Sequence, residues 1–519
     1  MTGPGQVLAI DAGGSVVKAT LFDLGSGGSR TRARSVPLTR PAPGQNERDA
    51  EVLWSATVEC IREVLAEPDA SRSRVLAVGF TGHGNGLYLV DAAGLPTRNA
   101  VMAADTRAAA AVRHWVADGW AEELQARSWN GLWAGQPGPI LASLVAAEPE
   151  VLRRSYAVLS CKDYLRGRLT GVVQTEMSDA SAGALYDNTA WAAAGGAAPL
   201  ALSEPAIAVF GLEAVRRLLL TPIGSQELGE VSVGAAAETG LPAGTPVVAG
   251  LVDNAALHHG SGVFDGAEIC VGAGTWSVNQ VLIPAGEATM DSILGAIRPT
   301  AASIALGGLA LLCEASPTSA STFDWALTRA LTRTSSQDGA AGRDVYAARL
   351  EREGARRQRV DDPMFLPFLD GSRADAGARG AWVGLSSSTG EDELLGAVVE
   401  GICLEHRRHI ERLQASMPQR LPVRLSGGAT KSEVWCQRFA DVLGVPVQIS
   451  PVSELGSVCA AALAGVGVDA FADVPQAVAT LNPRWRLFEP DPATADFVGQ
   501  RYERYCRVAD VLGELPWGA

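Results

Sequence analysis

A glycine-rich turn near the N-terminus carries the first residues of this chain that could do chemistry. Residues 7–22 form an apolar segment ending in an aspartate, a turn through two glycines and a serine, and a second apolar segment with a lysine. Glycines let the backbone approach a phosphate, and the N–H groups of such a turn can bind it. A nearby carboxylate can hold a hydrated Mg²⁺. The candidate ligands of ATP and Mg²⁺ are Asp11, Gly13, Gly14, Ser15 and Lys18. The alternative is an ordinary β-hairpin with a glycine turn.

Two later glycine turns could bind other parts of a nucleotide. Residues 268–283 repeat the pattern of two apolar segments joined by a glycine turn, and residues 425–432 place a double glycine after an apolar segment. The second of these runs into an expected helix over 433–443, whose N-terminus favours an anion. The candidate ligands here are Gly274, Thr275, Gly427, Gly428 and Ser432. Each turn alone is a weak signal, but three in this order favour a nucleotide site.

A carboxylate at the end of another apolar segment could act as a general base. Asp253 and Asn254 follow residues 246–251, which are predicted to form a buried strand. A carboxylate in that place could accept the proton of an attacking hydroxyl group. The alternative is that Asp253 only caps the helix that follows it. The three glycine turns favour the catalytic role.

The elements that must position these residues alternate along the chain. Strands are expected at 75–80, 87–90, 268–271, 276–283 and 304–313, and helices at 51–66, 107–126, 433–443 and 494–513. The repeated strand–turn–strand pattern predicts two related α/β lobes, because the same unit opens each half of the chain. We expect residues 1–262 to form the first lobe and residues 263–519 the second. No Gly-x-x-x-x-Gly-Lys-Ser/Thr sequence is present, which excludes a P-loop site.

Composition limits the classes of partner. The 519 residues exceed what one hydrophobic core holds, and 47% hydrophobic with 19% charged residues is typical of a globular chain. The net charge of −14 argues against general binding to nucleic acid or to anionic membranes. No apolar run approaches the ~20 residues of a membrane span. The N-terminus has no export-signal pattern, so we expect a cytoplasmic protein.

Cysteine and histidine spacing gives no metal motif. The eight cysteines are dispersed and form no C-x-x-C pair, which is typical of reduced thiols. His406 and His409 could share a metal from one helix face. No further ligands accompany them at suitable spacing, which favours a packing or surface role.

Further segments resemble the FGGY family of carbohydrate kinases. The most specific is Gly380-Ala-Trp382-Val-Gly384-Leu385 followed by residues 393–400, which is similar to the C-terminal signature of the family. Residues 429–441 are similar to its adenosine-side motif, and residues 162–171 to a segment of its N-terminal lobe. The resemblance extends from about residue 7 to about residue 470.

The resemblance implies an α/β fold of two ribonuclease H-like lobes, of the actin/hexokinase type, with ATP and substrate in the cleft between them. It implies ATP-dependent phosphorylation of a hydroxyl group of a sugar or polyol. Asp253 would be the general base, Asp11 would organise Mg²⁺, and the three turns would bind the phosphates and nucleotide. The N-terminal lobe would bind the sugar and the C-terminal lobe the nucleotide, and a homodimer is possible.

The resemblance also places the substrate against residues 81–86 and 104–107. With the base and its neighbour, these segments give the candidate substrate ligands His83, Asn85, Asp105, Asp253 and Asn254. Residues 84–86, 274–276 and 312–319 look most like the L-xylulose/3-keto-L-gulonate kinase branch, and erythritol kinases share much of this pattern. A non-catalytic sugar- or ATP-binding regulator of the same fold is a further alternative.

Overall fold

The computed structural model of the chain describes residues 5–67, 75–196, 198–274, 276–286, 300–331, 350–352, 359–369, 371, 378–415, 417 and 419–515. The chain forms two compact units, each built from more than one stretch of sequence. The first unit contains residues 1–265, 282–311 and 454–483, and the second contains 266–281, 312–453 and 484–519. The segments 282–311 and 454–483 thus lie beyond the boundary expected near residue 262 but pack in the first unit.

The first unit is built on a mixed sheet with the strand order β3-β2-β1-β5-β10-β9, and β11 also pairs with β5. β1 is antiparallel to β2 and parallel to β5, while β10 and β11 are both parallel to β5. The smaller strands form the pairs β4–β7 and β6–β8. The strands are β1 (Gln6–Ala12), β2 (Val16–Asp23), β3 (Ser29–Ser35), β4 (Glu47–Arg48), β5 (Val75–Gly82), β6 (Tyr88–Val90), β7 (Ala100–Val101), β8 (Ala157–Leu159), β9 (Leu228–Glu230), β10 (Pro246–Val248), β11 (Leu251–Val252) and β14 (Ala301–Ile304).

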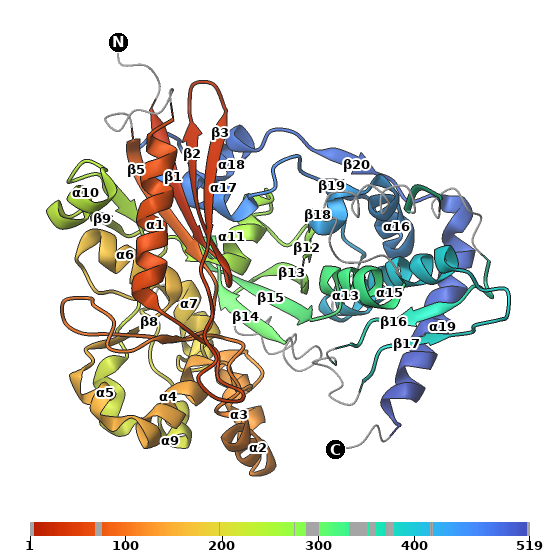
Figure 1. The fold of residues 1–519 in the computed structure, drawn as a ribbon, viewed down its shortest axis with the longest axis horizontal. Coiled ribbons are helices and arrows are strands. Elements are labelled where there is room, and N and C mark those ends of the chain that lie inside the picture. Colours follow the sequence, from red (N-terminus) through yellow and green to blue (C-terminus); the bar gives the residue numbers. More distant parts are fainter. Residues whose placement is uncertain are drawn as a thin grey trace. The chain divides into compact units, whose positions relative to one another are not determined.

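Helices pack on both faces of this sheet (Figure 1). The helices of the first unit are α1 (Ala50–Leu65), α2 (Ala109–Ala117), α3 (Trp120–Ser128), α4 (Pro137–Ala147), α5 (Pro149–Arg154), α6 (Cys161–Thr170), α7 (Met177–Ala182), α8 (Asn188–Ala193), α9 (Glu204–Phe210), α10 (Val233–Thr239), α11 (Asp253–Gly260), α17 (Leu455–Val466) and α18 (Val474–Leu481). Side chains alternate across a strand, so Phe80 packs in the core on the α1 face while Gly79 faces α17. A Cβ at Gly79 would lie 2.0 Å from the carbonyl oxygen of Ala460, so the close packing of α17 on β5 requires glycine.

The second unit repeats the strand topology of the first. Its sheet has the order β15-β13-β12-β18-β19-β20. β12 is antiparallel to β13 and parallel to β18, β18 is parallel to β19, and β19 is antiparallel to β20. The same series of pairings links β2, β1, β5, β10 and β9, as expected for two related units. The strands are β12 (Ile269–Ala273), β13 (Ser277–Pro284), β15 (Leu309–Ser316), β16 (Met364–Leu366), β17 (Ala381–Val383), β18 (Val423–Gly427), β19 (Val447–Ile449) and β20 (Arg486–Phe488).

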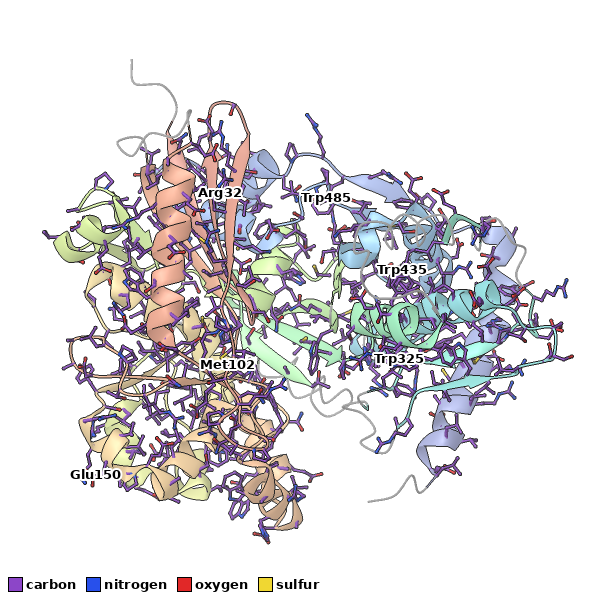
Figure 2. The ribbon with its side chains drawn as sticks, in the orientation of Figure 1. Arg32, Met102, Glu150, Trp325, Trp435 and Trp485 are labelled. Atoms are coloured by element: carbon purple, nitrogen blue, oxygen red, sulfur yellow. The ribbon has the colours of Figure 1, made fainter. Side chains whose placement is uncertain are left out.

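Helices and aromatic side chains complete the second unit. Its helices are α13 (Ala320–Trp325), α15 (Glu391–Leu413), α16 (Glu433–Leu443) and α19 (Ala495–Gly513), and a π-helical turn spans Ala326–Ala330. Trp325, labelled in Figure 2, stacks on Trp382 with 5.8 Å between ring centroids. The buried pair Arg501–Glu400 joins α19 to α15, with 3.0 Å between Nε and Oε1.

Most expected elements are confirmed, and three differ at glycines. The strand expected over 246–251 is divided into β10 and β11 beside Gly250, which has a φ of +79°. The helix expected over 107–126 is divided at Gly119, which has a φ of +85°, into α2 and α3. The strand expected over 304–313 is the hairpin of β14 and β15, because Gly307 and Gly308 both adopt positive φ between them. Among the described residues, no helix is both long and apolar enough to cross a bilayer.

Candidate active site

Three parallel strands of the first unit bring Asp11 and Asp253 to one edge of the sheet. Asp11 on β1 pairs in register with Thr81 on β5, and Thr81 pairs with Leu251 on β11. Asp253 follows β11 directly as the first residue of α11. Because the carboxyl ends of parallel strands meet at the same edge, two residues about 240 positions apart in sequence share one site.

Asp253 has the surroundings of a base. The N–H of Asn254 donates to its Oδ1 at 2.7 Å, and the N–H of Gly84 also donates to this carboxylate. Burial raises the pKa of Asp253 to about 6, and these two donors limit the rise. A carboxylate that is ionised at neutral pH but is a much better proton acceptor than a free aspartate suits general-base catalysis.

Asp11 lies in a cluster of charged groups. Burial raises its pKa to about 7, Lys18 opposes the rise, and the negative charges of Asp253 and Glu454 add to it. Lys18 itself pairs with Glu454, with 2.5 Å between Nζ and Oε2. The cluster carries more carboxylates than cations, so a bound cation would be stabilised beside Asp11. This donor set fits a magnesium ion.

The described residues contain no group of three or more His, Cys, Asp or Glu side chains arranged to hold a metal. Mg²⁺ is commonly held by only one or two carboxylates, water and substrate phosphates, so Asp11 remains a suitable ligand. His406 and His409 are buried and share Asn279 as a hydrogen-bond partner, with His406 Nδ1 2.7 Å from its Oδ1.

The first glycine turn is exposed on one side and supported on the other. The N–H of Gly13 donates to the carbonyl of Val16 at 2.9 Å and closes the turn, while Gly14 and Ser15 are exposed. The guanidinium of Arg48, which is fully buried, donates to the carbonyl oxygens of Gly13 and Gly14. Sequence reasoning missed Arg48, which lies in a polar segment with no recognisable pattern.

The loop after β5 holds two predicted substrate ligands in different environments. His83 is buried, its Nε2 lies 3.2 Å from the hydroxyl of Tyr88, and burial followed by the charge of Arg48 lowers its pKa to about 3. His83 is therefore a neutral side chain behind the loop. Asn85 has a φ of +55°, and its buried Oδ1 has no hydrogen-bond partner among the described residues.

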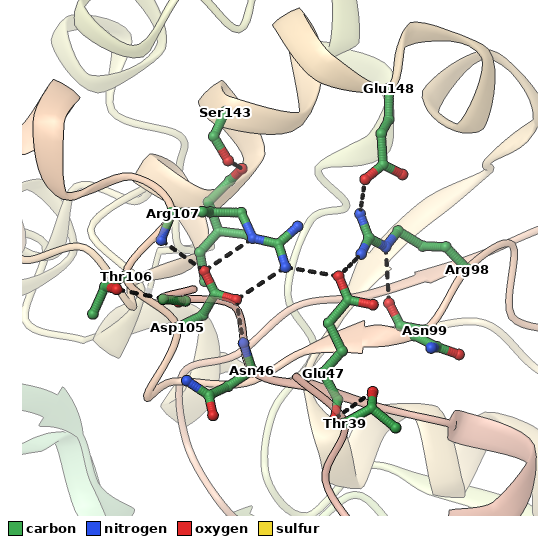
Figure 3. Close-up of polar contacts among 12 residues, drawn as sticks. Thr39, Asn46, Glu47, Arg98, Asn99, Asp105, Thr106, Arg107, Ser143 and Glu148 are labelled. Atoms are coloured by element: carbon green, nitrogen blue, oxygen red, sulfur yellow. Dashed lines mark hydrogen bonds and ion pairs between the residues drawn. The ribbon is translucent and has the colours of Figure 1, made fainter. Parts of the chain in front are cut away.

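Asp105, another predicted substrate ligand, is buried in an ion-pair network (Figure 3). Its Oδ1 accepts from Arg107 Nε at 2.9 Å, and its Oδ2 accepts from the N–H of Asn46 at 2.7 Å. Arg107 also binds Glu47, which binds Arg98. These contacts give Asp105 a role in holding the two segments together. Asn254, by contrast, is exposed beside Asp253.

A cavity of about 40 Å³ opens beside the Asn85 loop and is lined in part by Ser160 and Asp179. The Oδ1 of Asp179 is a second buried acceptor without a hydrogen-bond partner among the described residues. Its Oδ2 lies 3.0 Å from Nζ of the fully buried Lys162. A Cβ at Gly84 would lie 3.8 Å from Asp179 Oδ1 and 4.0 Å from Asp253 Oδ1. Asp179 and Asp253 therefore border the same glycine.

Asp179 belongs to a buried cluster of charged groups. Lys162 also pairs with Asp163 at 2.8 Å and Glu176 at 3.0 Å, and the buried guanidinium of Arg166 is attracted to both of these carboxylates. Burial raises the pKa of Asp179, Lys162 opposes the rise, and the other two carboxylates add to it. In the sequence, residues 162–171 were identified only by their similarity to a segment of the family. No sequence pattern connected Asp179 with the site.

The predicted nucleotide ligands of the second unit lie at the ends of β12 and β18. Gly427 pairs with Ala273, and with its φ of +92° a Cβ would lie 2.5 Å from the Ala273 carbonyl oxygen. Gly427 and Gly428 are exposed, and the carbonyl of Gly274 accepts from the N–H of Ala320 at 2.7 Å.

The other two candidate nucleotide ligands of that unit are Ser432 and Thr275. The hydroxyl oxygen of Ser432 accepts from the N–H of Trp435 at 3.3 Å, so Ser432 is the N-cap of α16. Thr275 lies outside the described residues.

Comparison with known proteins agrees with this arrangement. The model of the FGGY family of carbohydrate kinases, N-terminal domain, matches residues 6–260, and that of the C-terminal domain matches residues 270–468. The L-xylulose/3-keto-L-gulonate kinase of Escherichia coli strain K12 is 31% identical, with 96% of this chain and 95% of that protein aligned. The erythritol kinase of Brucella abortus strain 2308 is 28% identical, with 91% and 89% aligned.

A solved structure shares the fold. The ligand-bound xylulose kinase from Lactobacillus acidophilus has a TM-score of 0.85 at 19% identity, and 98% of each chain is covered. The family-domain matches in both halves and the full-length relative above 30% identity show that the chain belongs to the FGGY family of carbohydrate kinases and is an ATP-dependent carbohydrate kinase.

Proposed function

We propose that this kinase phosphorylates a hydroxyl group of a small neutral ketose or polyol, with L-xylulose as the preferred acceptor and erythritol as the alternative. The observation that carries the proposal is the place of Asp253, a carboxylate of raised pKa at the strand edge that it shares with Asp11 and the first glycine turn. The names of the Escherichia coli and Brucella abortus relatives support the two acceptors.

Asp253 is assigned as the general base. It accepts the proton of the acceptor hydroxyl while that oxygen bonds to the γ-phosphorus of ATP and the bond from phosphorus to the β–γ bridging oxygen breaks. The two backbone N–H groups that bind its carboxylate fix its orientation. The exposed N–H groups of the first glycine turn bind the phosphates and stabilise the charge that develops on them.

Mg²⁺, when bound with the nucleotide, neutralises charge on the phosphates, and Asp11 is the residue proposed to hold it. Lys18 assists the turn and is itself held by Glu454. In the second unit, Gly274, Thr275 and the double glycine at 427–428 are proposed to bind the rest of the nucleotide. Ser432 contributes there by fixing the start of α16.

Two acceptor oxygens at the cavity beside Asn85 support a neutral sugar or polyol as the acceptor. Asn85 Oδ1 and Asp179 Oδ1 accept hydrogen bonds and suit the hydroxyl donors of a sugar or polyol. A carboxylate on the substrate would find no hydrogen-bond donor at these two oxygens, because both are acceptors. We therefore expect 3-keto-L-gulonate to be a poorer acceptor than L-xylulose.

The test is ADP release with Mg²⁺-ATP against L-xylulose, 3-keto-L-gulonate, D-xylulose, D-ribulose, erythritol and glycerol. Asp253→Asn is the matched variant, because it keeps the shape of the side chain and removes the base. The expected result is one preferred neutral acceptor and a loss of kcat of roughly 10²–10⁴-fold in the variant. Absence of acceptor-stimulated turnover, or turnover unchanged in Asp253→Asn, would refute the proposal and favour a sugar- or ATP-binding regulator.

A further inference from the structure

Arg48 is a buried cation behind the first glycine turn. It is the second residue of the two-residue strand β4, and successive side chains of a strand point to opposite faces. Glu47 is directed to the network of Arg98 and Arg107 (Figure 3), whereas Arg48 reaches the opposite way to the carbonyl oxygens of Gly13 and Gly14. Its side chain is 0% exposed.

The charge of Arg48 is not balanced by a carboxylate among the described residues. Apart from the two carbonyls, its neighbours are His83, Tyr88 and Cys161. Burial lowers the pKa of His83 to about 3 and raises those of Tyr88 and Cys161, so all three are neutral at pH 7. Its Nε has no hydrogen-bond partner within the described part of the chain. An arginine is always charged, and a buried charge without a counter-ion is costly.

The contacts of Arg48 also decide where the N–H groups of the turn point. In a trans peptide the C=O of one residue and the N–H of the next point in opposite directions. The carbonyls of Gly13 and Gly14 point inward to Arg48, so the N–H groups of Gly14 and Ser15 point outward, where both residues are exposed. The result is two outward donors with a positive charge behind them, which is an arrangement that binds an anion.

We propose that Arg48 is a positioning residue for the terminal phosphates of the nucleotide. It holds the turn in its phosphate-binding conformation and supplies the positive charge that the phosphates neutralise. The proposal rests on the proposed function, because it takes ATP as the ligand of this turn. It predicts that loss of Arg48 weakens nucleotide binding through the phosphates and leaves the nucleoside and the acceptor unaffected.

The experiment measures binding of ATP, ADP and adenosine by calorimetry, without acceptor, to the wild type and to Arg48→Gln, Arg48→Lys and Arg217→Gln. Glutamine keeps a donor for one carbonyl and removes the charge, and lysine keeps the charge and loses the fork. Arg217, which is exposed, is the control for carbonyl contacts away from the turn, because it donates to the carbonyls of Leu152 and Ser155 in the same unit.

We expect Arg48→Gln to weaken ATP binding at least about tenfold, with adenosine binding within about twofold of wild type. Arg48→Lys should bind ATP about three- to tenfold more weakly than the wild type does. This variant provides the test if Arg48→Gln does not fold. In turnover assays the KM for ATP rises and the KM for the acceptor does not. Arg217→Gln should match the wild type throughout.

Two results overturn the inference. ATP binding within twofold of wild type in both Arg48 variants would refute it while leaving the kinase assignment intact. Equal losses for ATP, adenosine and acceptor would show that Arg48 only stabilises the fold. A wild type that binds adenosine, ADP and ATP equally, or not at all, would refute the assignment of the turn to phosphates and the proposed function with it.

Discussion

At the residue scale, we expect Asp253 and Asp11 to determine how activity depends on pH. Burial raises the pKa of Asp253 to about 6 and that of Asp11 to about 7, and the two groups interact. The charge of Asp253 contributes to the rise at Asp11, so we expect a pH profile to report apparent values for the site. We expect kcat/KM for the acceptor to rise from about pH 5 and to level off above about pH 7. A flat profile across this range, measured by ADP release in constant ionic strength, would contradict the role of Asp253.

Asp11→Asn should change how the stability of the fold depends on pH. The pKa of Asp11 is higher in the folded than in the unfolded chain, so the folded state binds the proton more tightly. Its contribution to the free energy of unfolding is therefore lost as pH rises from about 4 through about 7. We expect Asp11→Asn to be more stable than the wild type by roughly 1–2 kcal/mol at pH 8 and nearly equal at pH 4. Denaturant unfolding at the two pH values measures this, and equal stability at pH 8 would contradict it.

Site residues at the ends of strands could be predicted from the sequence. Residues that reach the site from distant parts of the sequence could not. Asp11 and Asp253 each end an apolar segment, and parallel strands align their ends. Glu454 reaches Lys18 across 436 positions of sequence, and no local pattern marks such a contact. Asp105 was predicted to bind substrate because residues 104–107 resemble a substrate-facing stretch of the family, and that resemblance did not reveal its buried ion pair with Arg107.

At the scale of elements, the packing of α17 on β5 is decided by one glycine. Gly79→Ala would place a Cβ 2.0 Å from the Ala460 carbonyl oxygen, and backbone atoms cannot move aside cheaply. We expect a loss of stability of roughly 1–3 kcal/mol or more. ATP should also bind more weakly, because α17 follows Glu454 and contributes Gly456, which lies against the Asp11 carboxylate.

Gly234→Ala is the matched control for this prediction. A Cβ at Gly234 in α10 meets nothing within 4 Å, and alanine is the better helix former. Its stability should be equal to or slightly above that of the wild type. Thermal unfolding of both variants, with and without ATP, provides the measurement. A Gly79→Ala protein as stable as Gly234→Ala would show that the packing tolerates a side chain.

Elements with strong periodicity were predicted closely, such as the helix at 433–443 that is α16. The misses occur where glycines interrupt an otherwise continuous apolar pattern, as in the hairpin of β14 and β15. Hydrophobicity alone does not reveal a turn there, because the residues on both sides remain buried.

At the scale of the whole molecule, the first unit is not a continuous piece of chain. A fragment of residues 1–262 contains β1 and β5 but lacks α17, which covers one face of both. We expect this fragment to show no cooperative thermal unfolding, because its sheet exposes an apolar face. Adding residues 454–483 as a separate peptide or a fused segment should restore cooperativity. A cooperative transition in the 1–262 fragment alone would show that this expected lobe folds independently.

The late arrival of α17 has a consequence for synthesis on the ribosome. The strands that it covers are complete by residue 82, yet the helix ends only at residue 466. At about 5–20 residues per second, this delay is on the order of 20–80 s. During that time each nascent chain presents the uncovered side of β1 and β5, and the same helix from a neighbouring chain can dock there. Slow or crowded translation should therefore favour exchange of α17 between copies, which chaperones that bind apolar strands would prevent.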